Sequence, residues 1–178
     1  MQDVATVFPE LDRIDDPDVR AGVRECWEVA RDDAGVESLA SVPWLPPTQR
    51  ELDLPDETLV GHVHDVVAAA VALAESLERT RGATVDDDLL VGGALVHDVS
   101  KLYEFDGMDD TDVYDLLGHP YYGVVTVTNA GLPVEYAHIV LSHTSRTTVE
   151  PAFLEAELIK RADEAAARDI RLRAERDD

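Results

Sequence analysis

The chain has 178 residues, of which 38 are Asp or Glu and 15 are Lys or Arg, so its formal net charge is −23. The length suits one domain, and a hydrophobic share of 45% excludes an acidic disordered chain, because that much apolar surface offsets the entropy lost on ordering. The charge argues against a basic patch that grips long nucleic acid and against docking on an anionic membrane.

Arginine supplies nearly all of the positive charge. Lys101 and Lys160 are the only lysines among the 15 basic residues. A dense carboxylate surface with little lysine predicts adaptation to a salty cytoplasm, since molar salt shortens the screening length to about 3 Å and removes self-repulsion. The alternative is an acidic surface that faces a partner.

Cys26 is the only cysteine, which excludes an intrachain disulfide and a zinc site built on thiolates. The longest apolar run covers residues 66–74 and is far shorter than the ~20 residues that span a bilayer. The N-terminus has no basic stretch followed by an apolar one. We therefore expect a soluble cytoplasmic protein with no membrane partner.

Residues 1–56 are predicted to form an accessory segment in front of a domain at residues 57–178. Asp15-Asp16-Pro17 is typical of a helix start, with Asp as the cap and Pro in the first turn, and this helix should continue to Ala30. The proline-rich stretch from Val42 to Pro47 is predicted to be an extended, non-helical connector. Trp44 within it is interpreted as a packing anchor. The segment caps either the domain or a dimer, and the sequence leaves both open.

From Pro55 onward the pattern predicts one helix after another. A long helix should run from about Asp56 to Arg81, with Gly82 as its stop signal. The later helices are expected from Asp86 through the pair His97-Asp98, over 110–117, from Pro120 to about residue 129, from Pro133 onward, and over 150–176. Few stretches favour strands and no repeat is present, so the predicted fold class is all-α.

Polar side chains interrupt the apolar faces of these helices. A step of about 100° per residue places His62 at the edge of the apolar face of the long helix and His64 on the opposite side. We expect His62 to point into the core and His64 toward solvent. On the following helix His97 and Lys101 share a face, and Asp98 lies beside it.

The last predicted helix carries Asp163 in the middle of its apolar stripe, whereas Asp169 is rotated away toward solvent. An uncompensated buried carboxylate costs roughly several kcal/mol, so Asp163 must be paired, protonated or bound to a metal. His119 and His143 stand at the ends of apolar helices. Each alone would more often be a hydrogen-bonded core residue or a helix cap than a ligand, and His138 is interpreted as structural or surface.

The positions of these residues, taken together, favour a metal site over isolated core histidines. Six residues from five helical segments are placed at the core or at clefts between helices: His62, His97, Asp98, His119, His143 and Asp163. Imidazole and carboxylate without thiolate are the ligand set of Mn, Fe, Co, Ni or Zn, with Mg as a further candidate. Six ligands are too many for one open catalytic site and suit two metals that share a bridging carboxylate. The spacing alone does not assign ligands to individual metals.

These residues resemble the HD-domain metal-dependent phosphohydrolases, over about residues 59–168. The resemblance rests on His62 in an apolar helix, the motif Ala94-Leu95-Val96-His97-Asp98-Val99-Ser100-Lys101, and the later Asp163. Gly118-His119-Pro120 and Ser142-His143 match the subgroup with two additional histidines. The resemblance implies an HD-type domain at residues 57–178, built as a bundle of about five to seven helices, with an N-terminal extension.

The resemblance also implies a ligand assignment. His62, His97, Asp98 and Asp163 would hold one divalent metal, and His119 and His143 would complete a second, with Asp98 bridging the two. Asp98 and Lys101 would be the catalytic residues, Lys101 as the lysine that faces the phosphate. Ser100 stands where the common motif has Gly. The Gly-Tyr-Pro element of the members that cleave cyclic dinucleotides is missing, so that activity is not implied.

The activity implied is metal-dependent hydrolysis of a phosphoester by attack of a metal-bridging hydroxide. The expected substrate is small and phosphorylated, most simply a nucleotide or oligonucleotide, while long nucleic acid is not expected and a homodimer stays open. Two alternatives remain: a non-catalytic domain whose metal site is structural or senses a nucleotide, and an all-α interaction module without metal.

Overall fold

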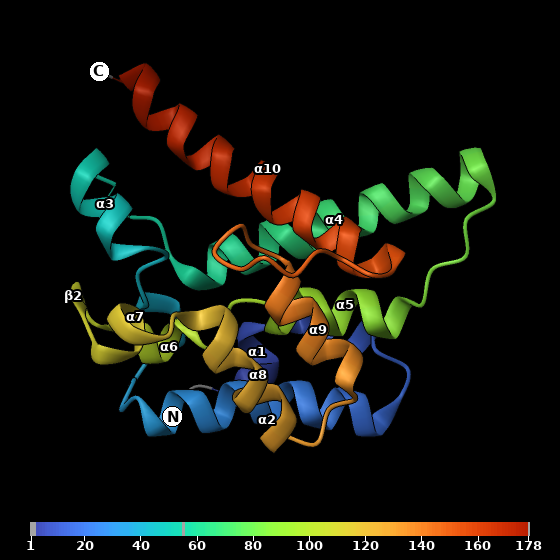
Figure 1. Cartoon of the computed structure of the whole chain (residues 1–178), viewed down its shortest axis with the longest axis horizontal. Coiled ribbons are helices and arrows are strands. Elements are labelled where there is room, and N and C mark those ends of the chain that lie inside the picture. The colour runs from blue at the N-terminus through green and yellow to red at the C-terminus, as the bar shows by residue number, and fades with distance from the viewer. Residues whose placement is uncertain (1–2, 55, 178) are drawn as a thin grey trace.

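The computed structural model describes residues 3–54 and 56–177, and the side chains up to residue 173. Its elements, coloured along the chain in Figure 1, are α1 (Val4–Val7), η1 (Pro9–Arg13), α2 (Pro17–Asp33), η2 (Leu39–Ser41), α3 (Pro46–Leu52), α4 (Leu59–Arg81), α5 (Asp87–Val96), α6 (Lys101–Glu104), β1 (Phe105–Asp106), β2 (Asp109–Asp110), α7 (Asp112–Leu116), α8 (His119–Asn129), α9 (Val134–Ser142) and α10 (Leu154–Asp177). Within the described residues the only sheet is the short β1–β2 hairpin. The predicted all-α class is confirmed.

The helix boundaries follow from capping residues. Asp16 accepts from the backbone N–H groups of residues 18 and 19 and precedes Pro17, the first residue of α2. Thr58 caps α4, which ends at Gly82 in the left-handed conformation with φ of 66°. Asp86 caps α5. These side-chain caps and the glycine satisfy backbone groups that helix ends leave unpaired, which is why the starts and stops predicted there are correct to within a few residues.

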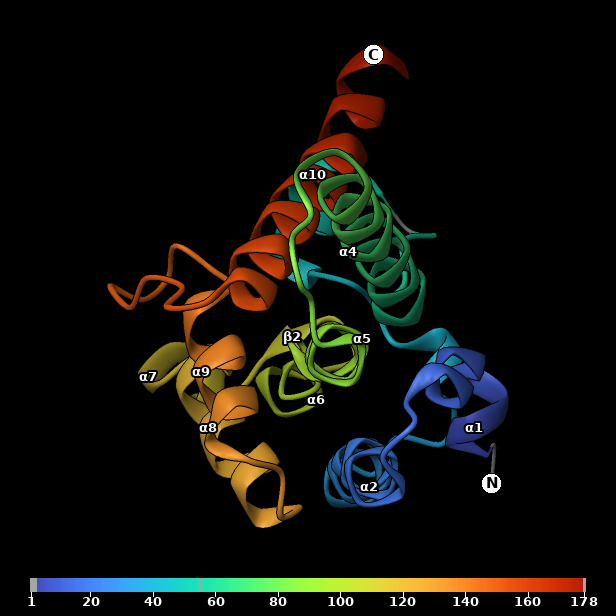
Figure 2. The same ribbon diagram turned by 90° about the vertical axis from the view of Figure 1, so that its right-hand side faces the viewer.

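Helix α5 lies at the centre of the bundle. Figure 2 shows it with α4 and α10 on one side, α2 opposite, and α8 and α9 beside it, and α5 packs directly against α2, α4, α9 and α10. Two glycines allow this close approach: a Cβ atom at Gly93 would lie 2.6 Å from Ile139 Cδ1 and 3.0 Å from Ile159 Cδ1, and one at Gly92 would lie 2.9 Å from the ring of Tyr136. This part of α5 is therefore held tightly against α9 and α10.

The N-terminal segment packs onto the same centre. The indole Nε1 of Trp27 donates to the backbone carbonyl of Leu95, at 3.0 Å. Asp88 accepts from the backbone N–H groups of Asp15 and Asp16, at 2.6 and 2.8 Å. Buried side chains of α1, α2 and η2 belong to the same apolar cluster as those of α4, α5 and α9. The core is thus continuous across residue 56, the predicted domain boundary, which itself stays a prediction.

Two local predictions were wrong, and a third holds only in part. Pro46 and Pro47 do not continue an extended connector but begin α3, because the first turn of a helix tolerates proline. His97, Asp98 and Lys101 do not share one helix, because α5 ends at Val96 and a tight turn leads into α6 at Lys101. His64 faces solvent only in part: its side chain is 34% exposed, and its Nδ1 lies 2.6 Å from Glu10 Oε1.

Helix α4 has the length and apolar composition of a membrane span, with a mean hydropathy of 1.3 over its best window. Half of that window is buried inside the fold, where α4 packs against α5 and lies side by side with α10 (Figure 1). A core helix meets the same criterion, so this finding is weak evidence for a span.

Candidate metal centre

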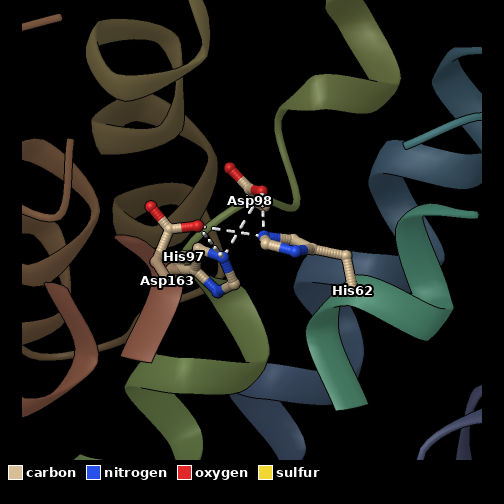
Figure 3. A group of neighbouring side chains, drawn as sticks. All are labelled: His62, His97, Asp98 and Asp163. Carbon is tan, nitrogen blue, oxygen red and sulfur yellow. Dashed lines mark hydrogen bonds and ion pairs between the residues drawn. The ribbon is translucent and has the colours of Figure 1, made fainter. Parts of the chain in front are cut away.

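The six residues predicted as metal ligands come together in two groups that share Asp98. The first group is His62, His97, Asp98 and Asp163, and the second is Asp98, His119 and His143. Within each group the ligand atoms lie within 4.8 Å of one another. Figure 3 shows the first group, in which the imidazoles and carboxylates point toward one another. All six residues that the sequence predicts as metal ligands therefore lie in one cluster.

The first group is built from three helices and a turn. His62 Nε2 lies 3.0 Å from Asp163 Oδ1 and 3.4 Å from Asp98 Oδ2. His97 Nε2 lies 3.3 Å from Asp98 Oδ2 and 4.0 Å from Asp163 Oδ1. His62 comes from α4, His97 caps the end of α5, and Asp163 lies within α10. Two carboxylates and two imidazoles thus face one small volume.

The second group surrounds the other oxygen of Asp98. His119 Nε2 and His143 Nε2 lie 3.3 and 3.5 Å from Asp98 Oδ1. The two imidazole nitrogens are also 3.3 Å from each other. His119 is the first residue of α8 and His143 caps the end of α9. Asp98 therefore directs one oxygen to each group, as a bridging ligand must.

The hydrogen bonds behind the rings fix their protonation. Nδ1 of His97 lies 2.7 Å from the carbonyl of Ala94, and Nδ1 of His143 lies 2.7 Å from the carbonyl of Val140. A carbonyl only accepts, so in each case Nδ1 carries the proton and donates. The lone pair of each neutral ring is consequently on Nε2, the nitrogen that faces Asp98. Backbone and carboxylate partners orient the histidine ligands of metal sites in this way.

The lone pairs of these Nε2 atoms face the carboxylate oxygens of Asp98, so hydrogen-bond acceptors lie against other acceptors. Nε2 of His97 and both carboxylate oxygens of Asp98 are buried without a hydrogen-bond partner among the described residues, apart from the ion pair of Asp98 Oδ2 with Lys101. Buried polar atoms are nearly always satisfied, and an unsatisfied group costs roughly 1–3 kcal/mol. A cation between the lone pairs of the histidines and the oxygens of Asp98 would satisfy them together. The residues present fit divalent metal ions that prefer nitrogen and oxygen ligands.

The carboxylates are held in their ionised form. Burial alone would raise the pKa of Asp98, but the charge of Lys101 is the foremost of the interactions that bring this pKa well below its usual value. Burial also opposes ionisation of Asp163, and the hydrogen bond from His62 is the foremost of the interactions that lower its pKa to about 2. Both groups are therefore charged at neutral pH, as metal ligands need to be.

Burial lowers the pKa of these histidines, whereas contacts with carboxylates raise it. Burial lowers the pKa of His62, but its contacts with Asp163 and Asp98 outweigh burial and raise that pKa overall. For His119 burial dominates, and its pKa is lowered. Without metal, a proton on Nε2 of His62 can join this ring to Asp163, and metal binding would release it.

Lys101 lies at the edge of the cluster rather than on an ordinary helix surface. It is 7% exposed, its Nζ is 2.6 Å from Asp98 Oδ2, and it stands 5.7 Å from the centre of the Trp44 ring. The tight turn between α5 and α6 places Lys101 three residues after Asp98 and on the same side. A buried ammonium beside a candidate bridging carboxylate is well placed to meet an anionic ligand.

A pocket of about 300 Å³ opens onto the cluster. Its wall includes the cluster residues Asp98, His119, His143 and Asp163, and beside them Trp44, Leu45, Lys101, Tyr114, Thr144, Ser145, Arg146, Ala167 and Arg171. The guanidinium of Arg146 lies 5.0 Å from the centre of the Tyr114 ring, and that of Arg171 lies 5.3 Å from the centre of the Trp44 ring. Three cations thus line one pocket of a strongly acidic chain.

Sequence reasoning missed Glu104, Arg146 and Arg171. Glu104 is completely buried behind His119, and the two arginines reach the pocket from the loop after α9 and from α10. A signal was available only for Arg171, which follows Asp163 by two helical turns and so lies near the same face. Nothing in the local pattern distinguishes Glu104 or Arg146 from other charged residues.

The histidines outside the cluster have structural roles, in line with the prediction for His138. His138 Nε2 accepts from the backbone N–H of Ala152, at 2.9 Å, and its ring packs on Phe153. His64, which with Asp65 repeats the His-Asp pair, is held by Glu10 as described above. Neither histidine belongs to the two candidate metal groups of the described residues.

Comparison with known proteins agrees with this geometry. A family model described as HD domain matches residues 59–168, which is more than half of the chain. The chain is 33% identical, over 112 residues, to a protein of Methanocaldococcus jannaschii named dihydroneopterin 2',3'-cyclic phosphate phosphodiesterase. That match covers 60% of this chain and 45% of the relative, so the chain spans about half of the relative's length. The search of solved structures gave no match.

Proposed function

This chain belongs to the HD-domain family, and we propose that within it the chain is a metal-dependent phosphohydrolase that acts on a small phosphoester. One observation carries the proposal. Asp98 is buried among the Nε2 atoms of four histidines, and apart from the ion pair of Oδ2 with Lys101 its oxygens have no hydrogen-bond partner among the described residues. A site that satisfies these atoms only through cations is built for metal chemistry.

The ligands fall into two proposed metal positions. His62, His97 and Asp163 with one oxygen of Asp98 would hold the first divalent ion, and His119 and His143 with the other oxygen would hold the second. When bound, a pair of divalent ions lowers the pKa of a water molecule between them and offsets the negative charge of a phosphate in the transition state. Both proposed positions border the pocket, since Asp98, His119, His143 and Asp163 line it.

The chain's own cations would orient the substrate. Lys101 Nζ lies 2.6 Å from Asp98 Oδ2 and lines the pocket, so it can donate to a phosphate oxygen while it remains near the bridging carboxylate. Arg146 and Arg171 line the same pocket, where their guanidinium groups suit phosphate or another anionic group of the substrate. Positive charge is concentrated here although the whole chain carries −23.

Pocket size limits the substrate. A volume of about 300 Å³ is at the lower end of the range for small-molecule sites and suits a mononucleotide or a similar compound. The M. jannaschii relative is named for a cyclic phosphate diester, which supports a small phosphodiester of nucleotide type as the first substrate class to test. Long nucleic acid is excluded from the proposal, because the acidic surface provides no counter-charge for its backbone.

The unusual Ser100 does not favour the non-catalytic alternative. Its hydroxyl donates to the backbone carbonyl of His119, at 2.7 Å, inside the core. It also packs against Gly123, where a Cβ atom would lie 2.8 Å from Ser100 Oγ. Ser100 thus helps to hold α8 in place, and the departure from the common motif has a structural explanation in this chain.

The proposal is tested by metal analysis followed by a substrate screen. Protein purified in high salt is analysed for bound metal, then assayed in molar KCl and in low salt with Mn²⁺, Co²⁺ or Ni²⁺ against phosphomonoesters, linear phosphodiesters and 2',3'-cyclic nucleotides. We expect about two metals per chain and turnover of at least one small diester. Asp98→Ala should lose both bound metal and turnover.

The outcomes of the screen distinguish the proposed enzyme from the two alternatives, a metal-binding sensor and an interaction module without metal. Hydrolysis by the Asp98→Ala variant at the wild-type rate would refute the proposed site. Two bound metals without turnover on any substrate would support a sensor instead. No bound metal, together with no loss of stability on chelation, would support an interaction module.

A further inference from the structure

Among the side chains that the structure describes, Glu104 is the most deeply buried carboxylate outside the candidate ligand set. It is the last residue of α6 and its side chain is 0% exposed. Buried carboxylates are rarely left unpaired, because the charge must be balanced by donors or by a nearby cation. The hydrogen-bond donors around Glu104 therefore indicate its role.

Three donors converge on Glu104, and two of them belong to His119. Oε1 accepts from the backbone N–H of His119 at 2.6 Å and from Arg146 Nη1 at 2.8 Å. Oε2 lies 3.0 Å from Nδ1 of the His119 ring. A carboxylate that accepts from a guanidinium and from a backbone N–H on one oxygen is ionised, and both of its oxygens can only accept.

The contact with Oε2 decides the tautomer of His119. An acceptor at 3.0 Å requires the proton on Nδ1, so Nε2 carries the lone pair. Nε2 is the atom that lies 3.3 Å from Asp98 Oδ1 and 3.3 Å from His143 Nε2. His97 and His143 obtain the same tautomer from backbone carbonyls. His119 begins its helix and obtains it from a side chain instead.

We propose that Glu104 is a positioning residue that locks His119 in the tautomer able to bind metal through Nε2, and that ties this ligand to Arg146 at the wall of the substrate pocket. The inference rests on the proposed second metal position, but it concerns atoms that are present without metal. Carboxylate partners of metal-bound histidines commonly change metal affinity 10- to 100-fold when replaced.

Glu104→Gln tests the proposal because the amide keeps the shape of the side chain. Its oxygen can still accept from the backbone N–H of His119 and from Arg146, which leaves the NH₂ group facing Nδ1 of His119. Nδ1 must then accept, and the ring proton moves to Nε2. If the amide were rotated by 180°, its NH₂ group would face two donors, the backbone N–H of His119 and Arg146 Nη1. This orientation is therefore unfavourable and does not restore the original tautomer.

The first measurement is the tautomer of His119 in metal-free protein, by ¹⁵N–¹H correlation of the imidazole nitrogens. The resonances are assigned by comparison with a His119→Gln variant. We expect the proton on Nδ1 in the wild type and on Nε2 in Glu104→Gln. The proton on Nε2 in the wild type would overturn the proposal, even if the variant did not fold.

The second measurement is Co²⁺ binding by titration calorimetry. Glu104→Gln should lose 10- to 100-fold in affinity for one of two equivalents and keep the other near the wild-type value. Unchanged affinity for both equivalents would overturn the inference and leave the proposed function standing. A wild type that binds no Co²⁺ at all would refute the proposed function, while the tautomer measurement would still test Glu104.

Two further variants separate the effect from general damage. Glu155→Gln makes the same chemical change at a buried carboxylate that accepts from the backbone N–H of Asp86, at 2.9 Å, and should keep both Co²⁺ affinities. Arg146→Met removes the third donor and leaves both bonds to His119, so it should keep the Nδ1–H tautomer. Loss of metal affinity in Arg146→Met equal to that in Glu104→Gln would show that Glu104 does not act through His119.

Discussion

Replacing Asp98 by Asn keeps the size of the side chain but removes the charge that both candidate metal groups share. Asp98 is 1% exposed, and its oxygens lie 3.3–3.5 Å from the Nε2 atoms of four histidines. An amide has only one acceptor oxygen and presents N–H donors on its other side, so it cannot bridge two cations. We therefore expect Asp98→Asn to lose metal-dependent stabilisation.

The magnitude follows from mass action. A metal present at 100 times its dissociation constant stabilises the folded chain by about 2.7 kcal/mol for one site. For a chain of this size each kcal/mol raises the melting temperature by about 2–4 °C. Saturation of one site should thus raise the wild-type melting temperature by about 5–11 °C, and Asp98→Asn should shift by less than ~2 °C.

The assay is thermal unfolding with excess Mn²⁺ or Co²⁺ and again with EDTA. The shift is measured within each variant, so that a change in metal-free stability cancels. Asp169→Asn is the matched control, since Asp169 lies on α10, is 66% exposed and pairs with Arg173; it should keep the wild-type shift. A wild-type shift in Asp98→Asn would refute the assignment of Asp98 as the shared ligand.

Three further predictions concern the rest of the molecule. Burial raises the pKa of the Cys26 thiol to about 12, so alkylation at pH 8 should be at least 100-fold slower in the folded than in the unfolded chain; the neutral thiol stabilises the fold below pH 9, and this contribution should fall as the pH rises from 9 toward 12. Equal alkylation rates would contradict the burial. Gly93→Ala places a Cβ atom 2.6 Å from Ile139 Cδ1 and should lower the free energy of unfolding by about 1–3 kcal/mol in urea titrations; an unchanged midpoint would show that the packing can adjust. With −23 net charges, the melting temperature should rise between 0.1 and 3 M KCl because the screening length falls from about 10 Å to below 3 Å; a constant or falling value would argue against adaptation to salt.

Local signals predicted the helices well. Pro17, Gly82 and Asp86 act through contacts within a few residues, so their effect on helix ends can be recognised in any sequence. The six candidate ligands were also recognisable, because each interrupts or terminates an apolar face. Their grouping around the two oxygens of Asp98 agrees with the assignment that the family resemblance implied, while their roles as ligands stay predictions.

Long-range contacts explain what the sequence did not predict. His64 was expected to face solvent because its helix face is polar, but Glu10, which is 54 residues away in the chain, contacts its ring and covers part of it. Glu104 contacts His119 although the β1–β2 hairpin and α7 lie between these two residues in the chain. Arg146 lies in a loop without periodicity, whose path depends on the packing of the helices on either side.

Local sequence patterns also misplaced two boundaries. The motif from residue 94 to residue 101 was predicted as one helix because its apolar positions keep helical spacing. The chain turns after Val96 instead, and this turn lets His97, Asp98 and Lys101 approach the cluster from one short segment. The extended connector predicted for Val42 to Pro47 ends before Pro46, because the place of Pro46 and Pro47 in the first turn of α3 makes them compatible with a helix.

The pocket has two walls of different origin. Trp44 and Leu45 belong to the N-terminal segment, whereas every candidate metal ligand lies after residue 59. The ring of Trp44 lies close to two cations of the pocket, 5.7 Å from Lys101 Nζ and 5.3 Å from the guanidinium carbon of Arg171. Substitutions in a short stretch outside the HD-domain match would therefore reshape the space offered to a substrate without altering the ligands. Relatives could diverge in the compound they accept by exchanging this stretch while inheriting the same reaction centre.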